Sequence, residues 1–393
     1  MSPTSPVVRQ MLALRARNAS LRQGVQRVAM LTPWLHAFPS TTREFIDELD
    51  SKMGYKISNI IQNGPHEVLT STSVAQPAIM ATSMLILRIL QRHFNFNVAE
   101  SVDYTLGHSL GEFAALVASG HLSYADSLRM VHARALAMED ATRRAQAAHP
   151  GSEYGMVAVI TEPEYLSSVV DTIHNIIGEN VNDWARTPVE GHVCIANVNS
   201  KDQIVLSGNI ESISCLMDRV RHFSGHDPRA VRLHSNTPFH SPLMQPAREA
   251  VRRIITAPGV LSFPSTGRTQ CVSNISARPF KSAAELCDLV SRSGLEPVRW
   301  ADSIKFLHSQ AQVRRWIGIG PGKVGRNLVG KEVGLRGTDK KRGAGVWAVT
   351  EPADIEEVLR GFEETDAGAQ MPEYAVHETM FNSGNGAPQQ TLA

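Results

Sequence analysis

The segment GHSLG at positions 107–111 constrains the fold more than any other part of the sequence. The residues before it, Ser101 to Leu106, favour a short strand, and Glu112 to Ser119 favour a helix that ends at Gly120. Glycines on both sides of a serine, between a strand and a helix, are typical of a sharp turn that lifts the hydroxyl out of a sheet. The first N–H groups of the helix then face any oxyanion formed there. The sequence therefore predicts an α/β fold in which Ser109 is a candidate nucleophile.

The remaining chain alternates predicted helices and strands. Apolar residues at helical spacing predict helices at Phe45 to Met53, Ser73 to Phe94, Ala125 to Gln146, Glu164 to Ile177 and Ile210 to Phe223. Strands are predicted at Tyr154 to Ile160, Val193 to Val198 and Gln203 to Ser207, and Arg229 to Leu233 is either a return strand or the connection back to the main sheet. We expect a hydrolase-like core with a mostly parallel sheet flanked by helices, interrupted by a small ferredoxin-like α+β subdomain.

These predictions divide the chain into segments. The core is assigned to 23–152 and 230–362, the small subdomain to 153–229, an N-terminal transit peptide or misassigned N-terminus to 1–22, and a disordered tail to 366–393. The segment from about 330 to 345 is rich in Gly, Lys and Arg, so we expect a mobile loop there.

Composition excludes several classes of protein. The 39 Lys and Arg residues nearly balance the 38 Asp and Glu residues, and a net charge of +1 argues against binding along a nucleic-acid backbone. The four cysteines show no CxxC spacing, which argues against a disulfide scaffold or a zinc site and favours a reducing compartment. The most apolar stretch, Ala78 to Leu90, is too short for a membrane span and meets Arg88.

Two further residues are candidates for chemistry. A serine hydroxyl needs a base, and among the 15 histidines His240 lies in a loop made rigid by Pro238 and Pro242. Arg134 lies among apolar residues of a predicted helix, where a buried guanidinium needs an anion. That anion is either a structural carboxylate or a substrate, and the residues alone leave both open, as they leave open an ordinary role for His240.

Five segments, taken in order, carry a family resemblance. They are QGVQ at 23–26, QPA at 76–78, GHSLGE at 107–112, NTPFH at 236–240 and GPGKV at 320–324, with weaker matches in NVNS at 197–200 and PVRW at 297–300. Together they resemble the malonyl-CoA:acyl-carrier-protein transacylase family, whose acyltransferase fold is shared with polyketide and fatty acid synthases. The match spans about residues 22–330, and the basic N-terminus makes the free-standing mitochondrial type the closest likeness.

The resemblance implies roles for the candidate residues. Ser109 matches the family nucleophile and His240 its base. The family orients this histidine with a main-chain carbonyl rather than a carboxylate, and the alignment places that carbonyl just before Pro297, at Ser293. Arg134 matches the arginine that binds the free malonyl carboxylate, a charge-assisted contact worth about 1.5–3 kcal/mol. Supporting roles are implied for Gln76, Asn199 and Ser293, and for Phe239, whose ring leaves little room for a methyl branch.

The implied oxyanion donors are the backbone N–H groups of Gln23 and Leu110. Here the sequence departs from the family, because Arg22 stands where the family loop Gly-Gln-Gly has its first glycine. Either the loop tolerates Arg22, or the protein is impaired, or the N-terminus is misassigned. The third explanation is favoured, because the family pattern resumes from Gln26 to Met30.

The implied reaction is a ping-pong transfer without a bound cofactor, in which a CoA thioester is the substrate. Malonyl-CoA acylates Ser109, and the phosphopantetheine thiol of acyl carrier protein then takes the malonyl group. Expected partners are malonyl-CoA and acyl carrier protein, with no nucleic acid and no membrane, and we expect a monomer. Because acyl carrier proteins are acidic, a local basic rim is expected, with Lys323, Arg326 and Lys331 as candidates.

The composition of the N-terminal segment predicts a targeting signal. No acidic residue occurs before Glu44, whereas arginine and hydroxyl residues are frequent, which is typical of a mitochondrial transit peptide. We therefore expect a location in the mitochondrial matrix. The alternative is a basic N-terminus that carries no targeting signal.

Two other functions remain open. An α/β serine hydrolase would share the Ser109 turn, but it would need an acid between Ser109 and His240 and has no need for Arg134. A catalytically impaired homologue that only binds carrier protein would account for the altered Arg22-Gln23-Gly24 loop.

Overall fold

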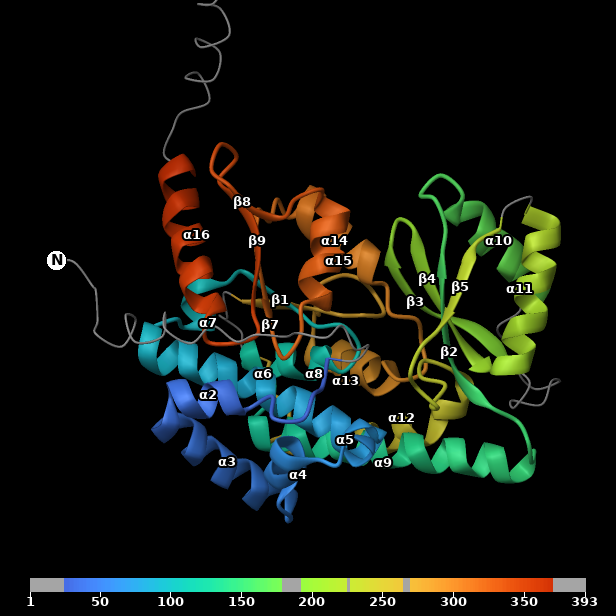
Figure 1. The fold of residues 1–393 in the computed structure, drawn as a ribbon, viewed down its shortest axis with the longest axis horizontal. Helices are drawn as coiled ribbons and strands as arrows, with labels where there is room; N and C mark the ends of the chain where they lie inside the picture. Colours follow the sequence, from blue (N-terminus) through green and yellow to red (C-terminus); the bar gives the residue numbers. More distant parts are fainter. Residues whose placement is uncertain (1–24, 179–191, 225–226, 264–268, 370–393) are drawn as a thin grey trace, which may run out of the picture.

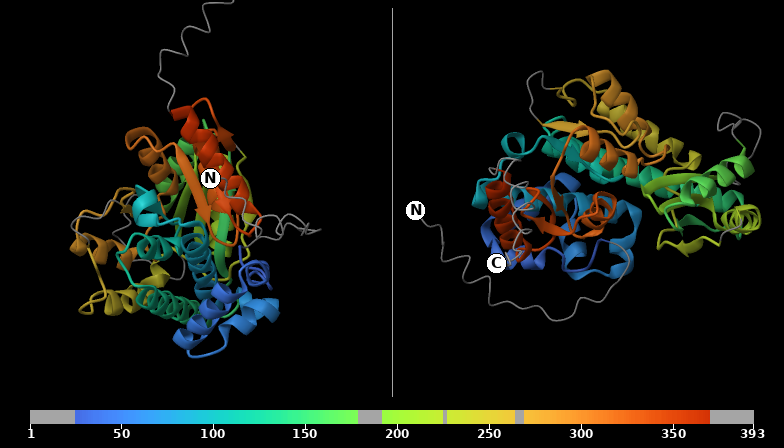
Figure 2. Two further views of the ribbon diagram at one scale, coloured as in Figure 1. Left: turned by 90° about the vertical axis from the view of Figure 1, so that its left-hand side faces the viewer. Right: turned by 90° about the horizontal axis from the view of Figure 1, so that it is seen from above.

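A computed structural model describes residues 25–178, 192–224, 227–263 and 269–369. A large unit of helices and short sheets holds most of the chain, and a smaller unit, green to yellow, lies at one end of it (Figures 1 and 2). Residues 1–24, which include the predicted transit segment and Gln23, lie outside the described residues.

In the described residues, the large unit contains two short sheets. Its strands are β1 (Tyr104–Leu106) and β6 (Gln270–Val272) in one sheet, and β7 (Arg315–Ile319), β9 (Ala344–Val349) and β8 (Gly337–Asp339) in the other. β1 pairs with β6 in parallel, and β7 pairs with β9 in parallel, whereas β8 pairs with β9 antiparallel. The carboxyl ends of β1 and β6 therefore meet at one edge, so the chain segments that follow them lie together.

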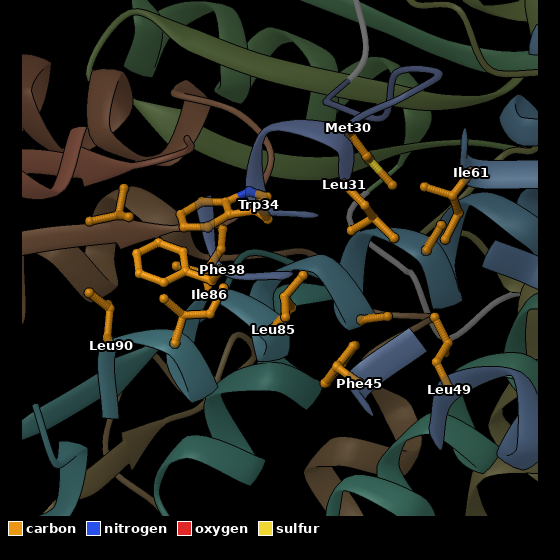
Figure 3. Packing of buried hydrophobic residues seen from close by; sticks show 14 of the residues in the cluster. Met30, Leu31, Trp34, Phe38, Phe45, Leu49, Ile61, Leu85, Ile86 and Leu90 are labelled. Carbon is orange, nitrogen blue, oxygen red and sulfur yellow. The ribbon is translucent and has the colours of Figure 1, made fainter. Parts of the chain in front are cut away.

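A layer of helices surrounds the long central helix α6. The central helix is α6 (Thr72–Phe94), and the helices around it are α2 (Thr32–Ala37), α3 (Pro39–Met53), α4 (Ile57–Asn63), α5 (His66–Thr70), α8 (Gly111–Ala118) and α9 (Tyr124–Ala148). Figure 3 shows Leu85 and Ile86 of α6 packed near Phe38 and Phe45, in a cluster that also holds Trp34. By length and composition α6 could cross a membrane, but 72% of its most apolar window is buried inside the protein. It is therefore the core helix on which the large unit is built.

The small unit is a four-stranded antiparallel sheet with two helices. Its elements are β2 (Tyr154–Ile160), α10 (Leu166–Ile177), β3 (Val193–Ser200), β4 (Gln203–Asn209), α11 (Ile210–Ser224) and β5 (Arg229–Arg232). The strand order is β3-β4-β2-β5, and α10 and α11 lie together beside the sheet (Figure 1). This order of strands and helices is that of a ferredoxin-like fold. Apolar residues of both helices, such as Val169 and Val220, pack with apolar residues of the sheet to form the core of this unit.

The remaining helices cover the large unit. They are α7 (Val98–Ser101), α12 (Gln245–Ile255), α13 (Ala283–Arg292), α14 (Trp300–Lys305), α15 (Val324–Val333) and α16 (Asp354–Ala369), with a 3₁₀ turn at Pro242–Met244 and a π-helical turn at Phe306–Gln310.

Three predictions about elements were wrong. Ser101 is the last residue of α7, so the strand before the GHSLG turn is shorter than expected. The segment from 330 to 345 is not a loop: it holds the end of α15, all of β8 and the start of β9, whose six residues are buried. Helix α16 continues to Ala369, so the tail assigned from residue 366 begins with helix, and residues 370–393 lie outside the described residues.

Candidate active site

Ser109 lies in the sharp turn between β1 and α8. Its φ is +50°, in the left-handed region that non-glycine residues rarely adopt. The turn folds so tightly that a Cβ on Gly107 would stand 1.9 Å from the carbonyl oxygen of Gly111, so residue 107 must be glycine. Gly111 is the first residue of α8, and the positive end of this helix therefore lies directly behind Ser109.

His240 comes from the loop after β5 and meets Ser109 across the site. Its Nε2 lies 2.7 Å from the Ser109 Oγ, and its Nδ1 lies 3.0 Å from the carbonyl oxygen of Glu296. A carbonyl oxygen only accepts, so Nδ1 carries the hydrogen and Nε2 is left to accept the serine O–H. The orienting carbonyl is that of Glu296 and not of Ser293, because Glu296 directly precedes Pro297 and its carbonyl points at the ring. The Ser293 carbonyl acts on the same ring and raises its pKa, but less strongly than that of Glu296.

The imidazole of His240 is held neutral. Only 2% of the residue is exposed. Burial, and then the nearby Arg134 and His108, lower the pKa of His240 to about 3. The ring is therefore a free base at neutral pH, and no described carboxylate touches it.

Arg134 is buried on α9 without an ion pair. It is 2% exposed, its Nη1 donates to the Gln76 Oε1 at 2.6 Å, and its Nε has no hydrogen-bond partner. Within the described ranges no carboxylate forms a hydrogen bond or an ion pair with its guanidinium, and the Glu112 charge acts on it only through space. Burial lowers the pKa of Arg134 to about 10, so the group still carries its charge at neutral pH. An unmatched buried cation with a free N–H group is suited to bind a carboxylate.

Glu112 is the only acidic group in the described part of the chain whose charge acts on Arg134. The residue is 1% exposed and lies on the first turn of α8. Burial raises the pKa of Glu112 to about 7, although the Asn274 backbone N–H and the Arg134 charge lower it. Its Oε1 accepts the Asn274 N–H at 2.8 Å.

Similarity to known proteins agrees with this geometry. The acyl transferase domain family matches residues 23–171. The chain is 31% identical over 349 residues to the malonyl CoA-acyl carrier protein transacylase of Bacillus subtilis (strain 168), covering 88% of this chain and 97% of that protein. The chain belongs to the malonyl CoA-acyl carrier protein transacylase family. A transacylase of the same name from Salmonella typhimurium is 29% identical over 302 residues, covering 77% of this chain and 87% of that protein.

Solved structures of the transacylase family confirm the predicted α/β fold class. An acyl-carrier-protein-S-malonyltransferase from Bartonella henselae superposes with a TM-score of 0.70 at 30% identity, covering 87% of this chain and 97% of that one. A second match is a type II PKS acyl-carrier protein in complex with its malonyl-transacylase, with a TM-score of 0.69 and 26% identity, covering 86% of this chain and 97% of that one. The ferredoxin-like subdomain is consistent with this fold.

Asn199, Phe239 and Ser293, the other site residues predicted from the transacylase family, make contacts with residues other than Ser109. Asn199 binds the ring of His108 at 2.9 Å, so it supports the turn from outside. Phe239 is half-buried in a cluster with Met138, one turn along α9 from Arg134. Ser293 is buried, and its hydroxyl donates to the carbonyl of Val290.

Leu110 is the expected oxyanion donor that lies among the described residues. The backbone N–H of Leu110 has no acceptor in the described part of the chain. Gln23 lies outside the described residues, and so does the Arg22 substitution beside it.

Sequence reasoning missed three groups at this site. The Glu296 carbonyl carries no side-chain signal, although its place before Pro297 was part of the family pattern. Glu112 follows the GHSLG segment directly, and an acidic residue inside an apolar helix could have marked it. Asn274 had no local signal that distinguishes it from an ordinary turn residue.

Proposed function

We propose that this chain transfers a malonyl group from malonyl-CoA, through an ester on Ser109, to the phosphopantetheine thiol of acyl carrier protein, for fatty acid synthesis. The relatives named as malonyl CoA-acyl carrier protein transacylases support this reaction. The observation that carries it is the pairing of a neutral His240 with the Ser109 hydroxyl beside a buried, unmatched Arg134.

In the first half-reaction, His240 Nε2 takes the proton from the Ser109 hydroxyl while Oγ attacks the thioester carbonyl carbon. The negative charge that develops on the thioester oxygen is stabilised by the free N–H of Leu110, with the Gln23 N–H as the proposed second donor. The tetrahedral intermediate formed by this attack then collapses and breaks the carbon–sulfur bond, and the His240 imidazolium protonates the leaving CoA thiolate.

In the second half-reaction the same groups act in the opposite direction. His240 takes the proton from the phosphopantetheine thiol, and the sulfur attacks the ester carbon of malonyl-Ser109. The carbon–oxygen bond then breaks, and Ser109 regains a proton from His240. The Glu296 carbonyl keeps the ring oriented in both directions, since its contact with Nδ1–H is unaffected by the proton that Nε2 carries.

Arg134 supplies the preference for malonyl. A guanidinium fork binds a carboxylate through two hydrogen bonds, and its buried position removes competition from water. Its present hydrogen-bond partner is the neutral amide of Gln76, so no carboxylate among the described residues binds the guanidinium, and the Glu112 charge acts on it only through space. The phenyl ring of Phe239 packs against a cluster that includes Met138 of the same helix as Arg134, where it limits the room for a branched acyl group.

The geometry disfavours a serine hydrolase with a carboxylate triad. His240 Nδ1 meets a main-chain carbonyl, so no described carboxylate holds the ring. Arg134 would also have no purpose in such a hydrolase. An impaired homologue is disfavoured by the intact Ser109–His240 contact.

Acyl carrier protein as partner is supported by the family and by the relative solved in complex with a type II PKS acyl-carrier protein. The basic rim named from the sequence supports it less, because its lysines are already paired within the chain. Lys323 Nζ lies 2.9 Å from Asp354, and Lys331 forms an ion pair with Asp202. A location in the mitochondrial matrix rests on the composition of residues 1–43, and a reporter fused to that segment would test it by its distribution in cells.

Intact-mass measurement tests the proposed function. The wild-type protein should gain the mass of one malonyl group when mixed with malonyl-CoA, and Ser109→Ala should gain none while keeping its fold, since the change removes one hydroxyl. Transfer to a carrier-protein thiol should then be faster than loss to water. Labelling of Ser109→Ala, or hydrolysis as the sole outcome, would contradict the proposal.

A further inference from the structure

The Asn274 side chain binds the backbone of the Ser109 turn at two places, one on each side of His108. Asn274 lies two residues after β6, and 2% of it is exposed. Its Oδ1 accepts the backbone N–H of Ser109 at 2.7 Å, and its Nδ2 donates to the carbonyl of Gly107 at 2.7 Å. A single carboxamide therefore satisfies two backbone groups that flank His108.

These two bonds have the pattern of a parallel β-ladder. β1 and β6 are parallel, with Leu106 opposite Val272. In such a ladder one residue accepts from the residue after its partner and donates to the residue before it. The Asn274 carboxamide does both around His108. A side chain thus continues the ladder past the point where Ser109, at a φ of +50°, leaves strand geometry.

The main chain of Asn274 is fixed as firmly as its side chain. Its N–H donates to the Glu112 Oε1 at 2.8 Å, and its carbonyl accepts the N–H of Arg299 at 2.9 Å. Glu112 belongs to the same GHSLGE segment that carries Ser109. The segment therefore holds Asn274 from one side, and Asn274 holds the segment from the other.

We propose that Asn274 is a positioning residue, which keeps the Ser109 turn in its left-handed conformation so that Oγ stays against His240 Nε2. This inference rests on the proposed role of Ser109 as the nucleophile. Because Asn274 occupies the Ser109 N–H, the next N–H, that of Leu110, is the one left free for an oxyanion. Removing the carboxamide leaves two buried backbone groups without partners and releases the strained turn.

The test compares Asn274→Ala with Asn209→Ala. Asn209 is also buried, at 9% exposed, and its side chain also accepts one backbone N–H, that of Ser212, but it lies in the small unit. The rate constant for acylation of Ser109 by malonyl-CoA, measured by rapid quenching and intact mass, should fall about 10- to 100-fold in Asn274→Ala. The malonyl-CoA concentration at half-saturation should stay within about twofold of wild type, because Arg134 is untouched.

Asn209→Ala should acylate within about twofold of wild type. Acylation of a folded Asn274→Ala at the wild-type rate would overturn the proposal, and so would an equal loss in both variants. Circular dichroism and thermal unfolding establish that each variant is folded.

Asn274→Asp is the second variant, and it carries the test where the alanine variant does not fold. The carboxylate keeps an acceptor for the Ser109 N–H but cannot donate to the Gly107 carbonyl until it is protonated. Its acylation rate relative to wild type should therefore rise as the pH falls from about 8 to about 5.5. Glu112, His108 and His240 face the same turn in both proteins, so the ratio removes the titration that the two proteins share. Burial lowers the pKa of both histidines, and Arg134 stays charged throughout.

If the acylation rate of Asn274→Asp relative to wild type does not change with pH, the positioning role of the bond from Nδ2 to the Gly107 carbonyl is overturned. A wild-type protein that takes no malonyl group would instead overturn the proposed function. In that case the rate at which a fluorophosphonate labels Ser109 is measured in the same set of variants. This rate reports the reactivity of the serine without malonyl-CoA, so failure of the positioning role can be distinguished from failure of the proposed function.

Discussion

Replacing Glu112 by Gln should make the stability of the protein less dependent on pH. Burial raises the pKa of Glu112 from 4.5 to about 7 in the folded protein. Between these values the folded protein keeps a proton that the unfolded chain has lost. A raised pKa of this kind gives stability that is fully present below pH 4.5 and is lost as the pH rises through about 7. Gln cannot titrate, so the variant lacks this loss.

The size of the effect follows from the two pKa values. Proton linkage at a single carboxyl that moves from 4.5 to about 7 amounts to about 2.5 kcal/mol between about pH 5 and about pH 8. The free energy of unfolding of wild type should therefore fall by this amount relative to Glu112→Gln over that range. Any constant offset between the two proteins, such as that from leaving Arg134 without an opposite charge, does not enter the difference.

Urea unfolding at three pH values measures this difference. The buried Trp34 and Trp347 provide a fluorescence signal for loss of the core. Glu249→Gln is the matched control, because Glu249 is exposed on α12 and the substitution there should leave the pH slope as in wild type. Parallel curves for wild type and Glu112→Gln would refute the reasoning. A slope of opposite sign would show that Arg134 stabilises the carboxylate more than burial destabilises it.

Two further predictions concern the proposed reaction. Arg134→Ala should reduce the preference for malonyl-CoA over acetyl-CoA by about 10- to 100-fold, because it removes the charge-assisted contact, whereas Arg129→Ala on the exposed side of α9 should not. Competition between the two thioesters measures this, and an unchanged preference would contradict the carboxylate assignment. Since the pKa of His240 is lowered to about 3, the rate of Ser109 acylation in Glu112→Gln should not fall tenfold between about pH 7.5 and about pH 5.5. A fall with a midpoint near 6.5 would show an ordinary histidine.

The turn at Ser109 could be predicted because its signal is local. Glycine at 107 permits a close approach that a Cβ would block, and the flanking strand and helix are short-range features. The segment from 330 to 345 was misjudged for the opposite reason. Its Gly, Lys and Arg content is typical of a loop, but β9 is paired on both sides and buried, and strand pairing between distant segments leaves little local trace.

The groups that orient the site were harder to predict than the groups that react. Asn274 reaches the site because β6 lies beside β1, and the Glu296 carbonyl reaches it next to the pairing of Val298 with β3. Neither pairing can be deduced from side-chain type. Lys323 and Lys331 show the same limit at the surface. Their positive charge is evident in the sequence, but the ion pairs that occupy them are made with residues far away in the chain.

Ser109 and His240 are both held in the left-handed region, with φ values of +50° and +57°. A non-glycine residue there costs about 1–3 kcal/mol, so each must be fixed by its surroundings. Asn274 fixes Ser109 from the loop after β6, while the Cys194 thiol on β3 donates to the His240 carbonyl at 3.2 Å and the Glu296 carbonyl accepts from its ring. These three groups come from separate segments of the chain. The reactive contact therefore depends on the assembled core, and a chain that kept both motifs but lost these contacts would relax away from the geometry that the transfer reaction requires.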